Sequence, residues 1–299
     1  MGKALALAVL LLSCLIGISA GDAIASQATP FDRASCLEWK KHVGNGIHHA
    51  AIAIPCANHF DTTDLRDGIA DIAFNEFHKV RNSKEISDEY FRVLGTRTAR
   101  LPSDWRAYIR TLALGWRFDK LRDLKSDADA KIWIGDQEFP DKLVDLPDSN
   151  GKDTVWRIDH ESRSLIEQHF YTREQPVIAV VFSPTCGPCK RAVVAIQSDP
   201  ELGPIFKKCS VWLGVVDQNF DLKTFSRWTH DNPEISTFLV RDWMSIGLDS
   251  PRFTPSFHLL VGGASIARVD GWPKSGNKAQ ILRALQKYNL YRTCRVGGD

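Results

Sequence analysis

The chain has 299 residues, enough for two domains that each have a core of their own. Its 38 Lys and Arg residues nearly balance its 36 Asp and Glu residues without forming a basic block, so nucleic acid is not an expected partner. Charged residues make up 25% and apolar residues 43%, which excludes a chain that is disordered throughout. Only one long apolar run is present, which excludes a membrane protein with several spans.

That apolar run lies at the start of the chain, from Ala4 to Ala20, and follows the positively charged Lys3. It is followed by an Ala-x-Ala pattern at residues 23–25. This layout predicts a secretory signal peptide over residues 1–25, and we expect export to a bacterial periplasm. Two alternatives remain: an uncleaved membrane anchor, and a lipoprotein signal with Cys14 as the lipidated residue. All three place the rest of the chain outside the cytosol.

The cysteine count agrees with export. After the predicted signal the chain keeps an even number of cysteines, and exported chains tend to pair their cysteines in an oxidising compartment. These are Cys36, Cys56, Cys186, Cys189, Cys209 and Cys294.

The first region, residues 26–153, is predicted to be mainly helical. Apolar residues between Leu65 and Phe77, and again between Trp105 and Trp116, recur with the period of a helix. The aromatic residues of the second stretch are interpreted as the buried face of that helix. Residues 136–153 are rich in Asp, Pro, Asn and Gly and are predicted to be a loop or linker. No motif in this region points to a chemistry.

The second region, residues 154–299, has the pattern of an α/β domain. Its apolar runs are rich in β-branched residues, as in strands that are buried on both faces. We expect a helix at 159–170, a strand at 177–182, a helix at 190–198, a strand at 211–216, strands at 257–261 and 266–269 joined as a hairpin, and a last helix at 277–288.

The motif Cys186-Gly187-Pro188-Cys189 directly follows one of these strands and opens a helix. A helix N-terminus offers free N–H groups and positive potential, and both favour a thiolate. Pro188 suits the first helical turn. We expect Cys186 to attack a disulfide and Cys189 to resolve the mixed disulfide. A zinc site would need a second such pair, and a haem site would need His where Lys190 stands.

These residues resemble the thioredoxin family. The matching positions are Cys186 to Lys190, Asp217 to Asn219, Thr254-Pro255 and Gly271. The resemblance implies a central mixed sheet flanked by helices over 154–299, after the mainly helical region. It also implies that Pro255 is cis and faces the cysteines. Gly187, Pro188, Thr254 and Pro255 would form the substrate-binding surface, with the Thr254 backbone pairing with an extended client segment.

The sequence departs from the family pattern in several places. Thr185 replaces the usual tryptophan, Val180 replaces a buried aspartate, and Leu213 replaces its lysine partner. The usual proton acceptor for the resolving cysteine is therefore missing, and the redox potential of cytosolic thioredoxin cannot be transferred. Extra residues at about 221–250 precede Thr254. They would either wall the substrate groove or form a packed decoration.

The remaining cysteines are interpreted as structural. In a thioredoxin topology, Cys209 and Cys294 both lie at the end of the sheet opposite the active site, so we expect them to form a disulfide. Cys36 and Cys56 would form the second pair. The rival for the second pair is a metal site with His48, His49 and His59, which the irregular spacing disfavours. We expect no metal and no cofactor.

The leading hypothesis is an exported protein-disulfide oxidoreductase that reduces client disulfides, because the Gly-Pro dipeptide resembles that of reducing members of the family. Its partners would be client proteins with disulfides or thiols and a membrane electron donor or acceptor. An oxidant or isomerase would use the same residues. A third hypothesis is a thioredoxin-fold structural component of an envelope secretion or conjugation complex. The oligomeric state is left open.

Overall fold

The computed structural model describes residues 102–147, 153–170, 175–249 and 253–294. All of them belong to one compact unit of the chain. The predicted signal peptide and the pair Cys36 and Cys56 lie outside the described residues, as does the first predicted helical stretch. None of the helices in the described part is long and apolar enough to cross a membrane.

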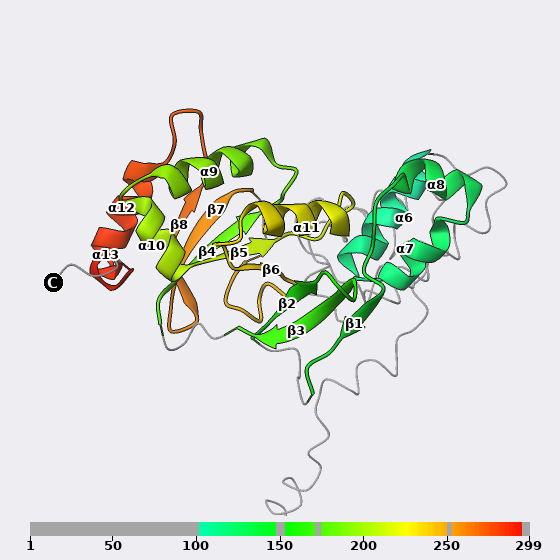
Figure 1. The fold of residues 1–299 in the computed structure, drawn as a ribbon, viewed down its shortest axis with the longest axis horizontal. Helices are drawn as coiled ribbons and strands as arrows, with labels where there is room; N and C mark the ends of the chain where they lie inside the picture. The colour runs from blue at the N-terminus through cyan, green and yellow to red at the C-terminus, as the bar shows by residue number, and fades with distance from the viewer. Residues whose placement is uncertain (1–101, 148–152, 171–174, 250–252, 295–299) are drawn as a thin grey trace, which may run out of the picture. The chain divides into compact units, whose positions relative to one another are not determined.

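Within these residues, eight strands form one mixed sheet in the order β1-β3-β2-β6-β5-β4-β7-β8 (Figure 1). Strands β4, β5 and β6 are parallel, whereas β7 runs antiparallel to β4 and β8 antiparallel to β7. The strands are β1 (Lys142–Val144), β2 (Thr154–Asp159), β3 (Ser164–His169), β4 (Val177–Phe182), β5 (Ser210–Gly214), β6 (Thr237–Leu239), β7 (Ser256–Val261) and β8 (Ala264–Asp270).

The helices of the described residues fall into two groups, one before β1 and one among the later strands. The first group is α6 (Pro102–Leu114), α7 (Phe118–Leu124) and α8 (Ala128–Ile134). The second group is α9 (Gly187–Ser198), α10 (Leu202–Cys209), α11 (Leu222–Asp231), α12 (Lys278–Lys287) and α13 (Leu290–Cys294).

The predicted α/β architecture of the second region is confirmed, and most of its elements lie where the sequence placed them. The apolar run at 177–182 is β4, which is buried along nearly its whole length. The hairpin of β7 and β8 turns at Gly262 and Gly263, both of which have a positive φ that suits glycine. The sheet is central and helices flank it, as the resemblance implied.

The helix predicted at 159–170 is wrong. This segment belongs to an antiparallel hairpin of β2 and β3, with Ile158 opposite Leu165. Their spacing fits one helix face but also fits two paired strands. The hairpin forms because β6 and β1 pair with its two sides, a tertiary contact that local periodicity does not report. The predicted linker 136–153 is wrong in its middle, because β1 lies there and pairs with β3.

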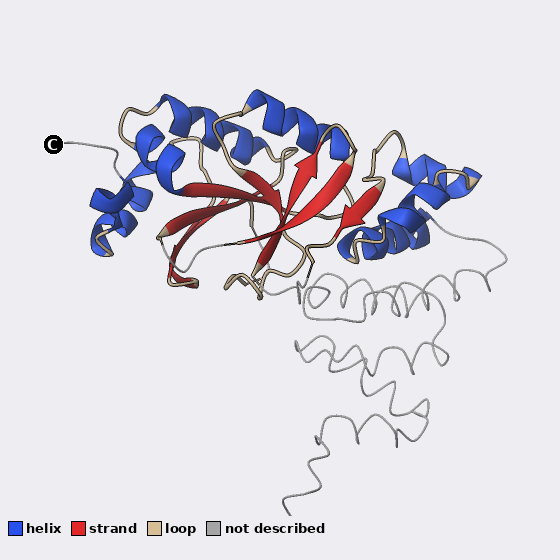
Figure 2. Cartoon of the chain, turned by 60° about the horizontal axis from the view of Figure 1, so that its bottom comes forward, coloured by secondary structure: helices blue, strands red, loops and turns tan. Residues whose placement is uncertain are grey.

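One face of the sheet is covered by helices (Figure 2). Phe182 of β4 packs against Trp228 of α11, with ring centroids 4.7 Å apart. On the same face Phe206 of α10 meets the edge of Phe257 on β7 at 6.1 Å. Such aromatic contacts anchor α10 and α11 to the central strands.

The opposite face is covered by part of the extra segment at about 221–250. Trp243, Ile246 and Leu248 are buried in one apolar cluster with Val181 of β4 and Leu213 of β5. The segment also supplies α11 and β6. Much of it is therefore packed into the core, as one of the two interpretations of the sequence expected.

The helical face predicted in the first region is confirmed for α6. Trp105, Tyr108 and Leu112 of α6 are buried, and so is Trp116, which lies in the turn just after the helix. Trp116 packs against Trp156 of β2, with centroids 5.4 Å apart. The aromatic residues are therefore core residues that join these helices to the sheet.

Candidate active site

The Cys-Gly-Pro-Cys motif lies between the end of β4 and the start of α9 (Figure 1). Cys186 is the residue that caps the N-terminus of α9, and Pro188 occupies the first turn. Proline fits there because its missing N–H would have no partner within the helix. The apolar strand and the capped helix thus fix the cysteine at the C-terminal edge of the parallel strands.

The two cysteines differ in exposure and are not bonded to each other. Cys186 is partly exposed, whereas Cys189 is buried in the first turn of α9. The backbone N–H of Cys189 donates to Sγ of Cys186 at 3.3 Å. A client can therefore reach Cys186, and the same sulfur has a donor that supports negative charge on it.

Burial raises the pKa of the Cys189 thiol, and the neighbouring Cys186 raises it further. Desolvation has this effect because it penalises the charged thiolate. Cys189 is therefore held as a protonated thiol until it reacts. This difference suits Cys186 to attack a disulfide first and Cys189 to react only in the second exchange.

The loop before β7 faces the motif. The Thr254–Pro255 peptide bond is cis, as the resemblance implied. The thiol of Cys186 donates to the carbonyl oxygen of Thr254, with sulfur and oxygen 3.3 Å apart. The N–H of Gly271, just after β8, donates to the carbonyl of Pro255 at 2.7 Å. The cis-proline loop thus contacts the sulfur on one side and is bonded to the segment after β8 on the other.

The fold is thioredoxin-like. A strand, a Cys-x-x-Cys helix cap, a parallel strand, a cis-proline loop, an antiparallel hairpin and a last helix follow one another in that order. The thioredoxin-like part also carries the hairpin of β2 and β3, the short strands β1 and β6, and helices α6 to α8.

The chain was compared with family models, curated proteins and solved structures. No protein-family model and no curated protein sequence matches the chain. Among solved structures, an uncharacterized thioredoxin-like protein from Porphyromonas gingivalis is 16% identical, with a TM-score of 0.34, over 47% of this chain and 90% of that chain.

Two further structures are similar at the same level. A thiol:disulfide interchange protein of the thioredoxin family from Chlorobium tepidum TLS is 12% identical, with a TM-score of 0.32, over 46% of this chain and 93% of that chain. A thioredoxin-like protein from Bacteroides caccae ATCC 43185 is 13% identical, with a TM-score of 0.31, over 87% of this chain and 95% of that chain.

The departures from the family pattern are visible in the core. Val180 and Leu213 are both fully buried among apolar side chains. Asp217 lies after β5 at the same edge of the sheet as the cysteines, and burial raises the pKa of its carboxyl. Its oxygen accepts the backbone N–H of Asn219 at 2.8 Å. Val180 and Leu213 stand where the family pattern has an aspartate and a lysine, and their apolar side chains offer no proton acceptor.

The second described cysteine pair lies away from this site. Cys209 and Cys294 form a disulfide with a Cα–Cα distance of 5.5 Å, as predicted. Among the described residues, no group of three His, Cys, Asp or Glu side chains is placed to hold a metal ion. The histidines of the rival metal site, like Cys36 and Cys56, lie outside the described part of the chain.

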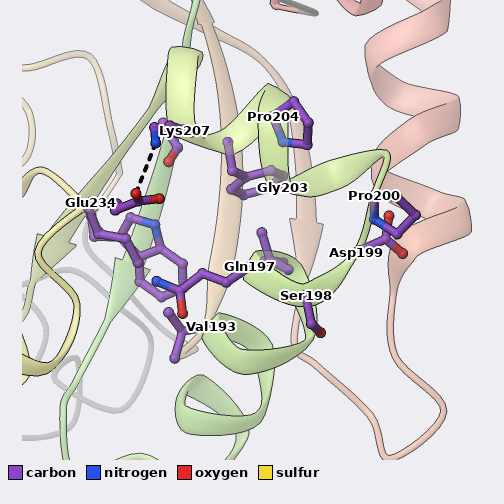
Figure 3. Close-up of a pocket in the computed structure, with 14 residues that line it drawn as sticks. Val193, Gln197, Ser198, Asp199, Pro200, Gly203, Pro204, Lys207 and Glu234 are labelled. Atoms are coloured by element: carbon purple, nitrogen blue, oxygen red, sulfur yellow. Dashed lines mark hydrogen bonds and ion pairs between the residues drawn. The ribbon is translucent and has the colours of Figure 1, made fainter.

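A cavity of about 460 Å³ opens between α9 and α10 (Figure 3). Val193, Phe206 and Trp212 contribute to its apolar lining, and an ion pair between Lys207 and Glu234 lies at its border. Neither motif cysteine lines it. The cavity is therefore separate from the sulfur site.

The sequence reasoning missed two features of this site. Arg191, in the first turns of α9, donates from Nη2 to the carbonyl of Trp272 at 3.5 Å. His258 is buried on β7, and its Nε2 lies 3.1 Å from Oγ of Ser256, the residue after the cis-proline. The signal for Arg191 was its position, two residues beyond the motif. Nothing local marked His258 as buried and hydrogen-bonded.

Proposed function

We propose that this protein is a thiol–disulfide oxidoreductase that acts on disulfides of client proteins. The observation that carries the proposal is the position of Cys186, partly exposed at a helix N-terminus and 3.3 Å from the carbonyl of Thr254 across the cis-proline loop. We propose Gly187, Pro188, Thr254 and Pro255, which adjoin this sulfur in the chain or across the loop, as the surface that binds an extended client segment.

The reaction proceeds in two exchanges. The Cys186 thiolate attacks one sulfur of the client disulfide, forming a mixed disulfide and releasing the other client sulfur as a thiolate. Cys189 then loses its proton and attacks Sγ of Cys186, which releases the second client thiolate. The client gains two electrons and two protons, and the Cys186–Cys189 pair is oxidised to a disulfide. The reverse sequence oxidises a client dithiol.

We favour the reducing direction, on the resemblance of the Gly-Pro dipeptide to that of reducing family members. A reductant needs a supply of electrons, for which we propose a membrane partner. The test is the equilibrium reduction potential of the Cys186–Cys189 pair, titrated against glutathione or dithiothreitol. A value near about −270 mV supports a reductant, and a value of about −180 to −120 mV replaces it with an oxidant or isomerase.

The same titration bears on a structural role. If the pair does not titrate reversibly, and a Cys186→Ser variant keeps full biological activity, the protein is a binding platform of an envelope complex instead. Loss of activity in that variant, together with a reversible titration, supports the enzyme.

We also propose that the protein acts outside the cytosol, in a periplasm. The predicted signal over residues 1–25 and the Cys209–Cys294 disulfide both support this location, because disulfides persist in oxidising compartments. Cell fractionation with mass spectrometry of the mature N-terminus tests it. A cytosolic protein that keeps residues 1–25 would contradict it.

A further inference from the structure

The guanidinium of Arg191 lies close to Gly187, the residue that follows the attacking Cys186 in the motif. One side of it is held by the carbonyl of Trp272, 3.5 Å from Nη2. Its Nη1 lies 3.7 Å from the point where a Cβ on Gly187 would sit. Gly187 is the neighbour of Cys186, and Trp272 follows Gly271, which bonds to the cis-proline. A fixed positive charge is therefore placed on the rim of the surface that a client must approach.

This charge is free to meet a client. The ion pairs among the described residues use other cations, and none of them involves Arg191. Its side chain is exposed, and so are the neighbouring cations Lys190 and Lys274. Asp217, at the same edge of the sheet, already accepts a backbone N–H and interacts with Arg110. The rim is thus cationic on the side of α9 and the loop after β8.

We propose that Arg191 makes this active site selective for disulfides that are flanked by carboxylates. The proposal rests on the thiol–disulfide activity proposed above and adds its substrate class. A guanidinium presents paired N–H donors that match a carboxylate, and its link to Trp272 limits the freedom that binding would remove. Because the charge lies beside Gly187, it attracts an acidic client group to the neighbourhood of Cys186 before the sulfurs exchange.

Alternative roles for Arg191 lead to different behaviour. If it only braces the loop after β8 against α9, its removal slows exchange with every disulfide by the same factor. If it selects by charge, its removal changes the rates according to the charge of the substrate. Exposed charge pairs are worth up to about 1 kcal/mol, so the selective effect is expected to be about fivefold.

The experiment measures second-order rate constants for the reduced protein with three alkyl disulfides of similar size. These are 3,3′-dithiodipropionate, which carries two carboxylates, bis(2-hydroxyethyl) disulfide, which is neutral, and cystamine, which carries two ammonium groups. Comparing each variant with the wild type on the same substrate removes the intrinsic reactivity of that substrate. The variants are Arg191→Gln, Arg191→Lys and, as a control, Lys287→Gln. Lys287 is an exposed cation at the far end of α12.

We expect Arg191→Gln to slow the reaction of the dicarboxylate about fivefold, to leave the neutral disulfide within about twofold, and to speed cystamine. Arg191→Lys should keep most of the preference, Lys287→Gln should match the wild type, and added salt should narrow the wild-type preference. Equal slowing of all three substrates, or no change with the dicarboxylate, would overturn the selectivity. If the wild type reduces none of the three, the proposed activity itself fails. Thermal melting of each variant reports whether it is folded.

Discussion

The two ends of the central sheet each hold a cysteine pair, and the pairs are built for opposite purposes. Cys186 and Cys189 lie at the C-terminal edge of the parallel strands β4 and β5, unbonded, with one sulfur partly exposed. Cys209 and Cys294 lie at the other edge, at the ends of α10 and α13, and are joined by a disulfide. The same side chain serves exchange at one end and cross-linking at the other.

The surroundings account for the difference. We call the edge that holds Cys209 and Cys294 the bonded end. There, Nζ of Lys208 donates to the carbonyl of Thr293 at 2.8 Å, and the hydroxyl of Tyr291 donates to Glu201 at 2.9 Å. Together with the disulfide, these contacts hold the last helix against α10 and the turn before it. We call the edge that holds Cys186 and Cys189 the open end. There, Cys186 has two long sulfur hydrogen bonds of 3.3 Å, which a client can replace. Reactivity thus follows from what surrounds each sulfur.

The largest effect that separates the two ends is expected from the attacking sulfur. Cys186→Ser should reduce the rate of exchange with any disulfide to that of the uncatalysed reaction, since no thiolate remains at the helix N-terminus. Cys189→Ser should still attack but should accumulate a mixed disulfide with the client, which mass spectrometry of the intact protein detects. Both variants should keep the wild-type melting temperature within a few degrees. A Cys186→Ser protein that still reduces disulfides would reverse the assignment of the two ends.

The second effect belongs to stability. Removing the other disulfide with the double variant Cys209→Ala/Cys294→Ala should lower the free energy of unfolding by about 4–5 kcal/mol, because the bond closes a long loop, with a sequence separation of 85. Urea unfolding under non-reducing conditions measures it. Exchange rates at 25 °C should stay unchanged, since the pair lies at the far edge of the sheet. A loss of exchange activity in the folded double variant would show that the two ends are coupled.

Much of the open end could be predicted because its signals are local. A strand is predicted by the apolar run Val177–Phe182, and a helix N-terminus by the Cys-Gly-Pro-Cys motif that follows it. A turn is predicted by the Thr254-Pro255 pair. How these segments meet was implied by their resemblance to the thioredoxin family. The Cys209–Cys294 bond followed from the same topology.

What could not be predicted depends on contacts between distant segments. The hairpin of β2 and β3 takes its identity from pairing with β6, which follows it by about seventy residues, and with β1. The orientation of Arg191 depends on Trp272, 81 residues away. Hydrophobic periodicity covers only one or two helical turns and does not include these distant partners. It therefore predicted a helix where β3 lies, and it gave no indication of the contact between Arg191 and Trp272.

Acid should lower the free energy of unfolding in two pH windows, and the higher window belongs to His258. His258 lies on β7 beside Ser256, and burial, with a smaller contribution from Arg268, lowers its pKa from 6.5 to about 4. An unfolded chain takes up a proton at this residue as the pH falls below 6.5, whereas the folded chain does not until about pH 4. The free energy of unfolding should therefore fall across that window by roughly 3 kcal/mol in total.

The carboxylates of the bonded end titrate in a lower window. Although burial alone would raise it, the hydrogen bond from Lys278 holds the pKa of Asp199 below its usual value. The same lysine and Tyr291 lower the pKa of Glu201. Unfolding curves at pH 7, 6, 5 and 4 for the wild type and for His258→Gln separate the two contributions. The variant should lose most of the pH dependence above pH 4.5, and an unchanged dependence would exclude His258 as its source.

The smallest effect is expected from a substitution at Gly247, which strains the bonded end without replacing a cysteine. Gly247 has a φ of 75°, and a Cβ there would overlap the carbonyl oxygen of Gly263 in the β7–β8 turn. That turn follows Val261, whose neighbour Leu260 pairs with Val177 at the start of β4, so it lies at the edge far from Cys186. Gly247→Ala should lower the free energy of unfolding by about 2 kcal/mol, from the positive φ and the clash together.

Gly135, just after α8, is the matched control for that glycine. Its φ is 58°, but a Cβ there would meet nothing within 4 Å. Gly135→Ala should therefore cost only the conformational part, about 1 kcal/mol. Urea unfolding of both variants measures the difference, and exchange rates report on the open end. Equal costs at the two positions would mean that the extra segment is not held tightly against the β7–β8 turn. A change in exchange rate with Gly247→Ala would mean that strain at one edge of the sheet reaches the other.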